Sequence, residues 1–439
     1  MAGRVLIVVH GYPPTARAGA EIHAWRSARG LTEQGLEVRV LAFERHTAGP
    51  LSGQDVDEDG VVVRRLSGDC EWGQRDRFRA SYDSDGMAAA MRELMADWRP
   101  HLVYLFSGYL MSSSIVRTAS SAGVPVVINL TDYWWFCHQI NLRRPDGARC
   151  DGPSLAGCAR CHAEGRRRWK LPGAKMPGLA KRFWELAPRL RFLQRALGVD
   201  AVRLRAETLA RALGEVSAFI APSKFLADFY QRYGVEPSRI HLIRQGLQVG
   251  APPARVPSDE LRIMYFGQLK AHKGVMTLLD AWSLLTGPKP RTLALWGSSA
   301  GEEGFGASVS QAAARLSGVV WRGAFAPQEV WQVLASADVV VVPSLWVENS
   351  PNVILEAQAM RVPVVGSNIG GIAELVRHDQ NGLLFETGSA RDLARQLQRL
   401  LDDPDLVARL SRDAPPVQTV AAEESAVLEV FRRFLPERR

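Results

Sequence analysis

The stretch RIMYFGQLKAHKGVMTLLDAW, Arg262 to Trp282, decides the fold. A run of apolar residues ends at Gly267 in a turn, and a helical pattern follows. The first part of the chain, Arg4 to Phe43, shows the same order and then adds a second apolar run at Val38–Phe43. Because strand, turn, helix and strand form a β-α-β unit, the sequence starts the same architecture twice.

Further apolar runs continue this pattern in both halves. Runs without polar alternation are typical of parallel strands that are covered on both faces. The candidates are Leu102–Phe106, Val124–Leu130 and Ala218–Ala221, and then Leu293–Trp296, Val319–Trp321, Val339–Val342, Val362–Val365 and Gly382–Phe385. The sequence therefore predicts two doubly wound, Rossmann-like α/β domains, with ligands at the carboxyl ends of the strands.

Length and proline content predict the domain boundaries. The 439 residues exceed what one core usually supports. A proline-rich break at 249–260 is the expected linker between an N-terminal domain, 1–248, and a C-terminal domain, 261–418. An amphipathic pattern within 419–439 predicts a helix that packs back across the domain interface.

Composition narrows the class of protein. Apolar residues make up 46% and charged residues 23%, which is ordinary for a globular protein, and no apolar run approaches the roughly 20 residues of a membrane span. The first apolar run ends in a Gly-Tyr-Pro-Pro turn without a cleavage site, so we expect a strand rather than a signal peptide, and a cytoplasmic location. The net charge of +8 is local, because Arg166–Arg211 alone carries thirteen Lys or Arg against three acids. A nucleic-acid partner is therefore not expected.

A candidate anion site lies at the segment ENSPNVILEAQAM. Pro351 suits the first position of a helix and Ser350 suits its cap, so the free N–H groups could accept a diphosphate. Glu348 precedes this helix and Glu356 lies in its second turn, and each carboxylate could bind vicinal hydroxyls. The pattern predicts an anionic ligand that carries hydroxyls at both ends.

Two further turns fit the same ligand. Gly267 lets the backbone approach closely, and Lys273 begins a helix that we expect to point at the crevice. Gly370 and Gly371 come immediately before another predicted helix.

At these residues the chain resembles a known family. The segments FGQLKAHKG, VVVVPSLWVENSPNVILEAQAMRVPVVGSNIGGIAELV and NGLLFE are similar to glycosyltransferase family 4, whose members are retaining enzymes with the GT-B fold. The resemblance implies a hexosyltransferase-type enzyme with a nucleotide-sugar donor in the C-terminal domain, an acceptor in the N-terminal domain and no catalytic metal. The acceptor would be a glycan, a lipid-linked glycan or a small molecule, in polysaccharide or lipid-linked glycan biosynthesis.

The resemblance also assigns roles to residues. Glu348 would bind the transferred sugar, Glu356 the ribose and Lys273 the diphosphate, while Gln268 stands where the family usually has an arginine. Helix N-termini and backbone amides would then contribute more of the diphosphate binding. The full donor-binding set is Gly19, Gly267, Gln268, Lys273, Gly297, Glu348, Asn349, Ser350, Pro351, Asn352 and Glu356.

Asp132 is the candidate for positioning or deprotonating the acceptor hydroxyl. The family commonly has His-Asp in this loop, and Thr131 occupies the position of the histidine. Asp132, Glu348 and Lys273 form the expected catalytic set. By resemblance, no strong protein nucleophile is needed, and stabilisation of the leaving diphosphate is the main catalytic contribution.

A cysteine-rich insert occupies about 133–165. Cys137, Cys150, Cys158 and Cys161 lie in a stretch with few apolar residues, and the last two have zinc-knuckle spacing. We expect a structural Zn²⁺ on these four thiolates. An iron–sulfur cluster, redox-active thiols and unligated cysteines remain open as alternatives, and the neighbouring His138 and His162 are expected bystanders.

A basic helical segment follows, at about 166–211. Phe183, Trp184, Leu190 and Leu197 recur there at helical spacing between Lys and Arg residues. Such a helix either binds an anionic membrane surface, on the cytoplasmic face of the inner membrane, or packs on the core with a solvated basic face.

Two other functions remain open from the sequence. One is a nucleotide-sugar epimerase of GT-B fold. The other is a non-catalytic glycan-binding or membrane scaffold with a degenerate site, which Gln268 and Thr131 keep in consideration. No G-x-G-x-x-G follows a predicted strand, which argues against a dinucleotide dehydrogenase.

Overall fold

The chain folds into two compact units. The computed structural model describes residues 3–16, 19–44, 47–166, 169, 175–250, 253–326 and 329–436. The gaps remove 167–168 and 170–174 of the predicted basic segment, 251–252 of the predicted linker and 437–439 of the C-terminal segment from the description. The first unit comprises Met1–Pro222, Ala227–Ile243 and Val420–Arg439, and the second comprises Ser223–Leu226 and Arg244–Thr419.

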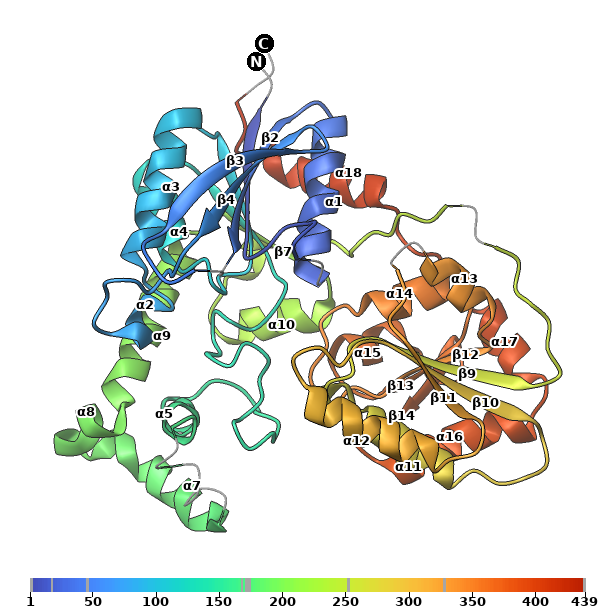
Figure 1. The fold of residues 1–439 in the computed structure, drawn as a ribbon. Helices are drawn as coiled ribbons and strands as arrows, with labels where there is room; N and C mark the ends of the chain where they lie inside the picture. The colour runs from blue at the N-terminus through green and yellow to red at the C-terminus, as the bar shows by residue number, and fades with distance from the viewer. Residues whose placement is uncertain are drawn as a thin grey trace. The chain divides into compact units, whose positions relative to one another are not determined.

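The first unit is built on an eight-stranded sheet with the order β3-β4-β2-β1-β5-β6-β7-β8 (Figure 1). All neighbouring strands are parallel except the hairpin of β3 and β4. The strands are β1 Arg4–Val9, β2 Glu37–Glu44, β3 Ser52–Glu58, β4 Val61–Ser67, β5 Leu102–Phe106, β6 Val126–Asn129, β7 Ala218–Ala221 and β8 Ile240–Leu242. The sequence prediction did not include β3, β4 or β8, and the residues of β3 are mostly polar and exposed on the sheet edge.

Helices flank this sheet and extend beyond it. They are α1 Gly19–Glu33, α2 Arg77–Ala80, α3 Asp85–Trp98, α4 Ser114–Ser121, α5 Leu155–Glu164, α7 Pro177–Leu186, α8 Gln194–Leu197, α9 Val199–Glu215, α10 Lys224–Arg232 and α18 Val420–Phe431. The structure places α18 beside α1, although the two lie at opposite ends of the sequence (Figure 1).

Apolar packing and two buried hydrogen bonds hold α18 on α1. Val427 and Phe431 are fully buried in the core formed with β1 and α1. The Glu423 carboxylate lies 2.6 Å from His23 Nε2, and Ser27 Oγ donates to the Glu424 carboxylate at 2.6 Å. The C-terminal helix is therefore part of the first unit's core.

The second unit is a six-stranded, wholly parallel sheet with the order β11-β10-β9-β12-β13-β14. Its strands are β9 Leu261–Phe266, β10 Arg291–Trp296, β11 Val319–Gly323, β12 Val339–Val342, β13 Val364–Ser367 and β14 Gly382–Phe385. Its helices are α11 Val275–Ser283, α12 Glu303–Ala314, α13 Val330–Ala335, α14 Asn352–Ala359, α15 Gly370–Leu375, α16 Ala390–Asp402 and α17 Leu406–Arg412.

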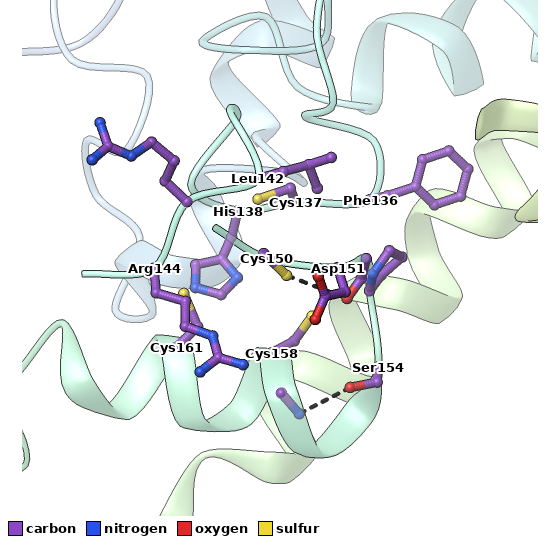
Figure 2. A pocket seen from close by; sticks show the side chains of 14 residues that line it. Phe136, Cys137, His138, Leu142, Arg144, Cys150, Asp151, Ser154, Cys158 and Cys161 are labelled. Carbon is purple, nitrogen blue, oxygen red and sulfur yellow. Dashed lines mark hydrogen bonds between the residues drawn. The ribbon is translucent and has the colours of Figure 1, made fainter. Parts of the chain in front are cut away.

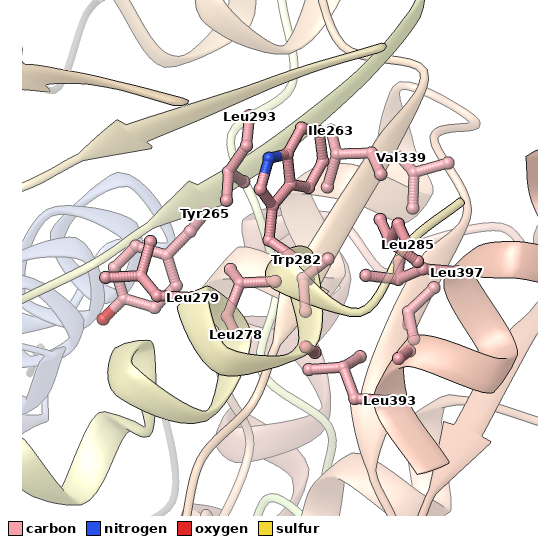
Figure 3. Packing of buried hydrophobic residues seen from close by; sticks show 14 of the residues in the cluster. Ile263, Tyr265, Leu278, Leu279, Trp282, Leu285, Leu293, Val339, Leu393 and Leu397 are labelled. Atoms are coloured by element: carbon pink, nitrogen blue, oxygen red, sulfur yellow. The ribbon is translucent and has the colours of Figure 1, made fainter. Parts of the chain in front are cut away.

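The core of the second unit forms where α11 and α16 cover the sheet. Trp282 of α11 lies among aliphatic side chains of β9, β10 and β12, and Leu393 and Leu397 of α16 close the cluster (Figure 3). The helix predicted after Gly267 thus supplies one buried face of this domain. Two parallel-sheet α/β units confirm the predicted fold class. Among the described residues, no helix has an apolar stretch long enough to cross a membrane.

Candidate functional site

Two glycines shape the turns after β9 and β10. Gly267 and Gly297 have φ of +150° and +153°, a region that side chains rarely adopt. A Cβ atom at Gly297 would lie 1.8 Å from the Gly267 carbonyl oxygen, whereas one at Gly267 would meet only Tyr265, at 3.6 Å. The two turns therefore pack backbone on backbone, and Gly267 leaves open space above it.

The turn after β9 is pressed against the loop after β12. A Cβ atom at Gly274, where φ is +74°, would lie 1.9 Å from the Pro343 carbonyl oxygen. The Leu345 N–H donates to the His272 carbonyl at 2.8 Å. This packing brings Lys273 to Glu348.

Glu348 is held through one of its two carboxylate oxygens. Oε1 accepts hydrogen bonds from Lys273 Nζ at 2.6 Å, Trp346 Nε1 at 2.7 Å and Ser344 Oγ at 2.8 Å. The residue is only 7% exposed, and Oε2 has no hydrogen-bond partner among the described residues. The carboxylate is thus fixed in orientation with one oxygen available to a ligand.

Helix α15 starts against the same loop. The Gly371 N–H donates to the Glu348 carbonyl at 2.8 Å, and a Cβ atom at Gly371 would lie 1.7 Å from the Asn349 carbonyl oxygen. Glycine is therefore required there by contact with backbone, and α15 supports the position of Glu348 from behind.

Three local details of the sequence-based interpretation were wrong. Helix α14 begins at Asn352 with Pro351 as its extended N-cap and no side-chain cap, so Ser350 does not cap it. Lys273 ends a 3-10 turn, Ala271–Lys273, and α11 begins at Val275. Gly370 and Gly371 are the first residues of α15 and do not precede it. Each helix starts one or two residues from the predicted place, because residue spacing does not reveal how many residues the turn between strand and helix contains.

The other predicted donor residues are distributed around these turns. Glu356 is half-buried in the second turn of α14. Asn349 accepts a hydrogen bond from Ser223 Oγ at 2.9 Å. The Gln268 side chain is exposed, while its carbonyl accepts from Tyr265 Oη at 2.7 Å.

In the first unit, polar residues gather at the ends of three adjacent strands. His10 directly follows β1, Ser107 directly follows β5, and Asp132 follows β6. Ser107 Oγ donates to Asp132 Oδ2, and the Trp134 N–H donates to Oδ1 at 2.8 Å. Burial raises the pKa of Asp132, and these hydrogen bonds and the charge of His10 offset only part of that rise.

His10 also contacts an acid at the start of α1. His10 Nε2 lies 3.4 Å from Glu21 Oε1. Burial acts to raise the pKa of Glu21, but the hydrogen bond and charge of His10 outweigh it and the pKa is lowered. The sequence interpretation missed His10 and Ser107. Their signal is the position immediately after a buried parallel strand. Gly19 begins α1, and a Cβ atom there would contact nothing within 4 Å, so packing does not require glycine.

The predicted cysteine cluster comes together in the first unit. Cys137, Cys150, Cys158 and Cys161 all line one cavity of about 140 Å³, and none forms a disulfide (Figure 2). As they stand, no three or more His, Cys, Asp or Glu side chains among the described residues are arranged to hold a metal ion.

The basic segment contains both buried and exposed apolar side chains. Trp184, Ala187 and Leu197 are buried with Ala159 and Ala163 of α5. Three apolar side chains of the same segment remain in solvent, namely Leu179 at 63%, Leu186 at 51% and Phe192 at 82% exposure. Part of the segment therefore packs on α5, and part of it is exposed.

Comparisons with known proteins identify the family of this chain. The glycosyl transferase 4-like domain family matches residues 18–246, and the family described as glycosyl transferases group 1 matches residues 260–403. A D-inositol 3-phosphate glycosyltransferase from Rhodococcus jostii is 28% identical over 233 residues, covering 48% of this chain and 51% of that protein. The corresponding protein from Arthrobacter sp. is 32% identical over 164 residues, covering 36% and 38%. The chain thus matches about half the length, or less, of these curated relatives.

Solved structures share the fold over nearly the whole chain. HepE from Anabaena, in complex with UDP and glucose, has a TM-score of 0.64 at 17% identity and covers 98% of this chain and 100% of that one. Sucrose-phosphate synthase from Thermosynechococcus elongatus has a TM-score of 0.68 at 17% identity, covering 98% of each chain. These neighbours are GT-B glycosyltransferases, which confirms the predicted GT-B fold. Because the first family match spans more than half of the residues, the chain belongs to the glycosyltransferase 4-like family.

Proposed function

We propose that this chain transfers a sugar from a nucleoside diphosphate sugar to an acceptor hydroxyl with retention of configuration. The observation that carries the proposal is the Glu348 carboxylate at the carboxyl end of β12, which is anchored through Oε1 and has no partner at Oε2 in the described part of the chain. Ligands of doubly wound domains bind at such strand ends. A fixed acceptor oxygen beside an ammonium group suits a molecule that carries both hydroxyls and a diphosphate.

The donor residues have distinct roles in this proposal. Glu348 Oε2 accepts hydrogen bonds from the sugar, and Glu356 binds the ribose. Lys273 shares its charge between Glu348 and the diphosphate, which develops negative charge as the bond to the sugar breaks. The open backbone above Gly267 and Gln268 lets the diphosphate approach closely, while Gly297 shapes that turn from beneath.

Asp132 serves the acceptor in this proposal. A buried carboxylate with a raised pKa is a stronger base than an ordinary aspartate, so it suits removal of a proton from a hydroxyl. Its orientation is fixed from both oxygens, by Ser107 and by the Trp134 backbone.

The comparisons guide the choice of substrates to test. HepE was solved with UDP and glucose, so UDP-hexoses are the first donors to examine. The relatives named D-inositol 3-phosphate glycosyltransferase make a phosphorylated polyol a reasonable small acceptor, to be tested beside glycans and lipid-linked glycans.

An anionic membrane is a second proposed partner. The exposed apolar residues Leu179, Leu186 and Phe192 share their segment with exposed Lys181 and Arg182. Apolar side chains that enter the lipid boundary beside cations that meet anionic headgroups are the pattern of an interfacial helix. The protein would then work peripherally at the cytoplasmic face of a membrane that carries its acceptor.

Release of the nucleoside diphosphate tests the proposed reaction. Purified protein is incubated with a panel of nucleotide sugars and acceptors, and diphosphate release is followed with NMR of the anomeric proton of the product. We expect acceptor-dependent release from one donor class and retained configuration.

Two outcomes would favour the other functions. Conversion of the donor to an epimer without an acceptor would indicate an epimerase. Binding of a sugar without any turnover, across the whole panel, would indicate a scaffold.

A further inference from the structure

The strongest unassigned feature is the cavity that the four cysteines line (Figure 2). Cys137 lies in the loop after β6, and Cys150 follows a two-residue bridge between Arg143 and Arg149. Cys158 and Cys161 are three positions apart on α5, which places them on one face of the helix. Three separate segments thus bring their sulfur atoms to a single space.

The four cysteines share this cavity with Phe136, His138 and Leu142, and none of the four forms a disulfide. Four cysteine thiolates are a common ligand set of structural Zn²⁺.

A buried cation faces the same cluster. Arg205 of α9 is 5% exposed, and its Nη2 donates to the Trp134 carbonyl. No carboxylate among the described residues lies within ion-pair distance of it, and it lines a neighbouring cavity together with Cys158. A buried guanidinium without an opposite charge is costly, so anionic sulfur in the cavity would offset that cost.

We propose that Cys137, Cys150, Cys158 and Cys161 bind one Zn²⁺ as four thiolates. Each thiol gives its proton to solvent, and four Zn–S bonds close the site with a net charge of −2 that Arg205 partly balances. The sulfur atoms of the described residues do not form a ready ligand set, and the ion would occupy the cavity of about 140 Å³ that they line.

A metal explains how this insert acquires a fixed fold. Between Cys137 and Cys150 the chain has no helix or strand, and both Ile140 and Leu142 have positive φ, at 71° and 53°. Non-glycine residues hold such conformations only where their surroundings enforce them. A zinc ion would tie this loop to α5, which packs on α7 and α9.

Metal analysis of the full-length protein tests the proposal directly. Protein purified under reducing conditions, loaded with zinc and freed of unbound metal should hold about one zinc per chain, the stoichiometry of a single four-thiolate site. Replacement of the zinc with Co²⁺ should give intense thiolate-to-cobalt charge-transfer bands and the d–d bands of tetrahedral cobalt. This readout uses the wild-type chain, so it does not depend on the folding of any variant.

Substitutions assign the ligands. Cys158→Ser should abolish the cobalt charge-transfer spectrum or weaken it strongly, whereas Cys70→Ser, which alters a buried cysteine outside the cluster, should leave it unchanged. Arg205→Met should speed the loss of zinc to a chelator by about 10-fold, the lower end of the effect of partners around a metal site. Arg203→Met, two residues away and paired with Asp200, is its matched control.

Three results would overturn the proposal. The first is a folded, zinc-loaded preparation that retains less than about a tenth of a metal ion per chain, against the one expected. The second is iron with an iron–sulfur absorption spectrum. The third is a pair of disulfides among these cysteines in the native protein.

Discussion

At the residue scale, the decisive feature is the asymmetry of Glu348. Three donors converge on its Oε1, so the cost of burying this carboxylate is met within the protein while Oε2 stays available. The Glu348 charge also holds the ammonium group of Lys273, the residue that occupies the family's usual position for binding the diphosphate. One ion pair thus orients two proposed donor contacts.

Glu348→Gln should lower sugar transfer by about 100-fold, because it removes a preorganised charge that would act on the reacting sugar. Without the Glu348 charge beside it, Lys273 should also bind the diphosphate with a different affinity. Diphosphate release at saturating donor measures the effect. Asp280→Asn, an exposed change in the same unit, should retain wild-type activity. Equal activity of Glu348→Gln and the control would remove Glu348 from the mechanism.

The pH dependence of sugar transfer should reveal the ionisation of the Asp132 carboxyl group. Its carboxylate must be ionised to accept a proton, and burial raises its pKa above the ordinary value. The acid limb of kcat/KM should therefore lie at a higher pH than for an ordinary aspartate. Asp132→Asn should lower the rate and abolish that limb, measured as a pH profile of diphosphate release. A variant with the wild-type profile would exclude Asp132 as the base.

At the element scale, helix starts and helix packing set the sites. The turn of β9 into α11 lies against the loop after β12, and α15 begins against that same loop. In the first unit, α18 buries Glu423 and Glu424 against His23 and Ser27 of α1. Both arrangements bring residues that are distant in sequence into direct contact.

Gly371→Ala should destabilise the second unit by about 1–3 kcal/mol, as expected for overpacking against backbone. The added Cβ would lie 1.7 Å from the Asn349 carbonyl oxygen and push α15 away from the Glu348 loop. Thermal melting and transfer activity should both fall. Gly304→Ala, in α12 with nothing within 4 Å, is the control and should be neutral or slightly stabilising. Similar melting temperatures for the two variants would contradict this account.

Stability should decline as pH rises because of the α18 cluster. Burial, and then the charge of Glu423, raise the pKa of Glu424 to about 7, and the pKa of His23 is also raised, by Glu423 against the effect of burial. The folded state therefore binds protons more tightly than the unfolded state, and the free energy of unfolding falls as pH rises through about 7. For Glu424, a rise from the ordinary 4.5 to about 7 corresponds to a loss of about 3 kcal/mol.

Glu424→Gln should flatten this pH dependence and melt above the wild type at pH 8, because a neutral amide can still accept the Ser27 hydrogen bond. Melting temperatures from pH 5 to 8 measure it. Glu429→Gln, on the same helix but exposed and paired with Arg432, should follow the wild-type curve. Parallel curves for Glu424→Gln and the wild type would contradict the assignment.

At the scale of the whole molecule, charge is concentrated where apolar side chains are exposed. Most of the excess positive charge lies in the segment Arg166–Arg211, which also carries the protruding Leu179 and Phe192. Binding should therefore require both anionic lipid and these apolar contacts.

Liposome sedimentation tests this surface. We expect binding to anionic vesicles at low salt and weak binding to neutral ones. Phe192→Ser combined with Leu179→Ser should reduce binding about 30-fold, since each removes an apolar side chain worth roughly 1 kcal/mol when it enters the lipid boundary. Val320→Ser, an exposed change at 43% in β11, is the control. Equal sedimentation with neutral and anionic vesicles would exclude the proposed membrane surface.

The local pattern of apolar residues predicted much of the fold. Apolar runs such as Leu102–Phe106 and Val339–Val342 coincide with β5 and β12, because a strand buried on both faces must be apolar throughout. The strands β3, β4 and β8 were not predicted, and the exposed residues of the edge strand β3 need no apolar pattern. The predicted cap of α14 was wrong. Pro351 can occupy either the first helical position or the N-cap position, and only the backbone conformation decides between them.

The sequence by itself determined the alternation of strands and helices, the two domains and the proximity of Glu348 to a helix start, because each depends on local apolar periodicity and turn residues. Only the tertiary structure decided that Lys273, Ser344 and Trp346 share one oxygen of Glu348, that His10 and Ser107 reach the Asp132 site, and that α18 buries its acids beside α1. Those contacts join residues up to 400 positions apart, and strand order, which no local pattern encodes, brings them together.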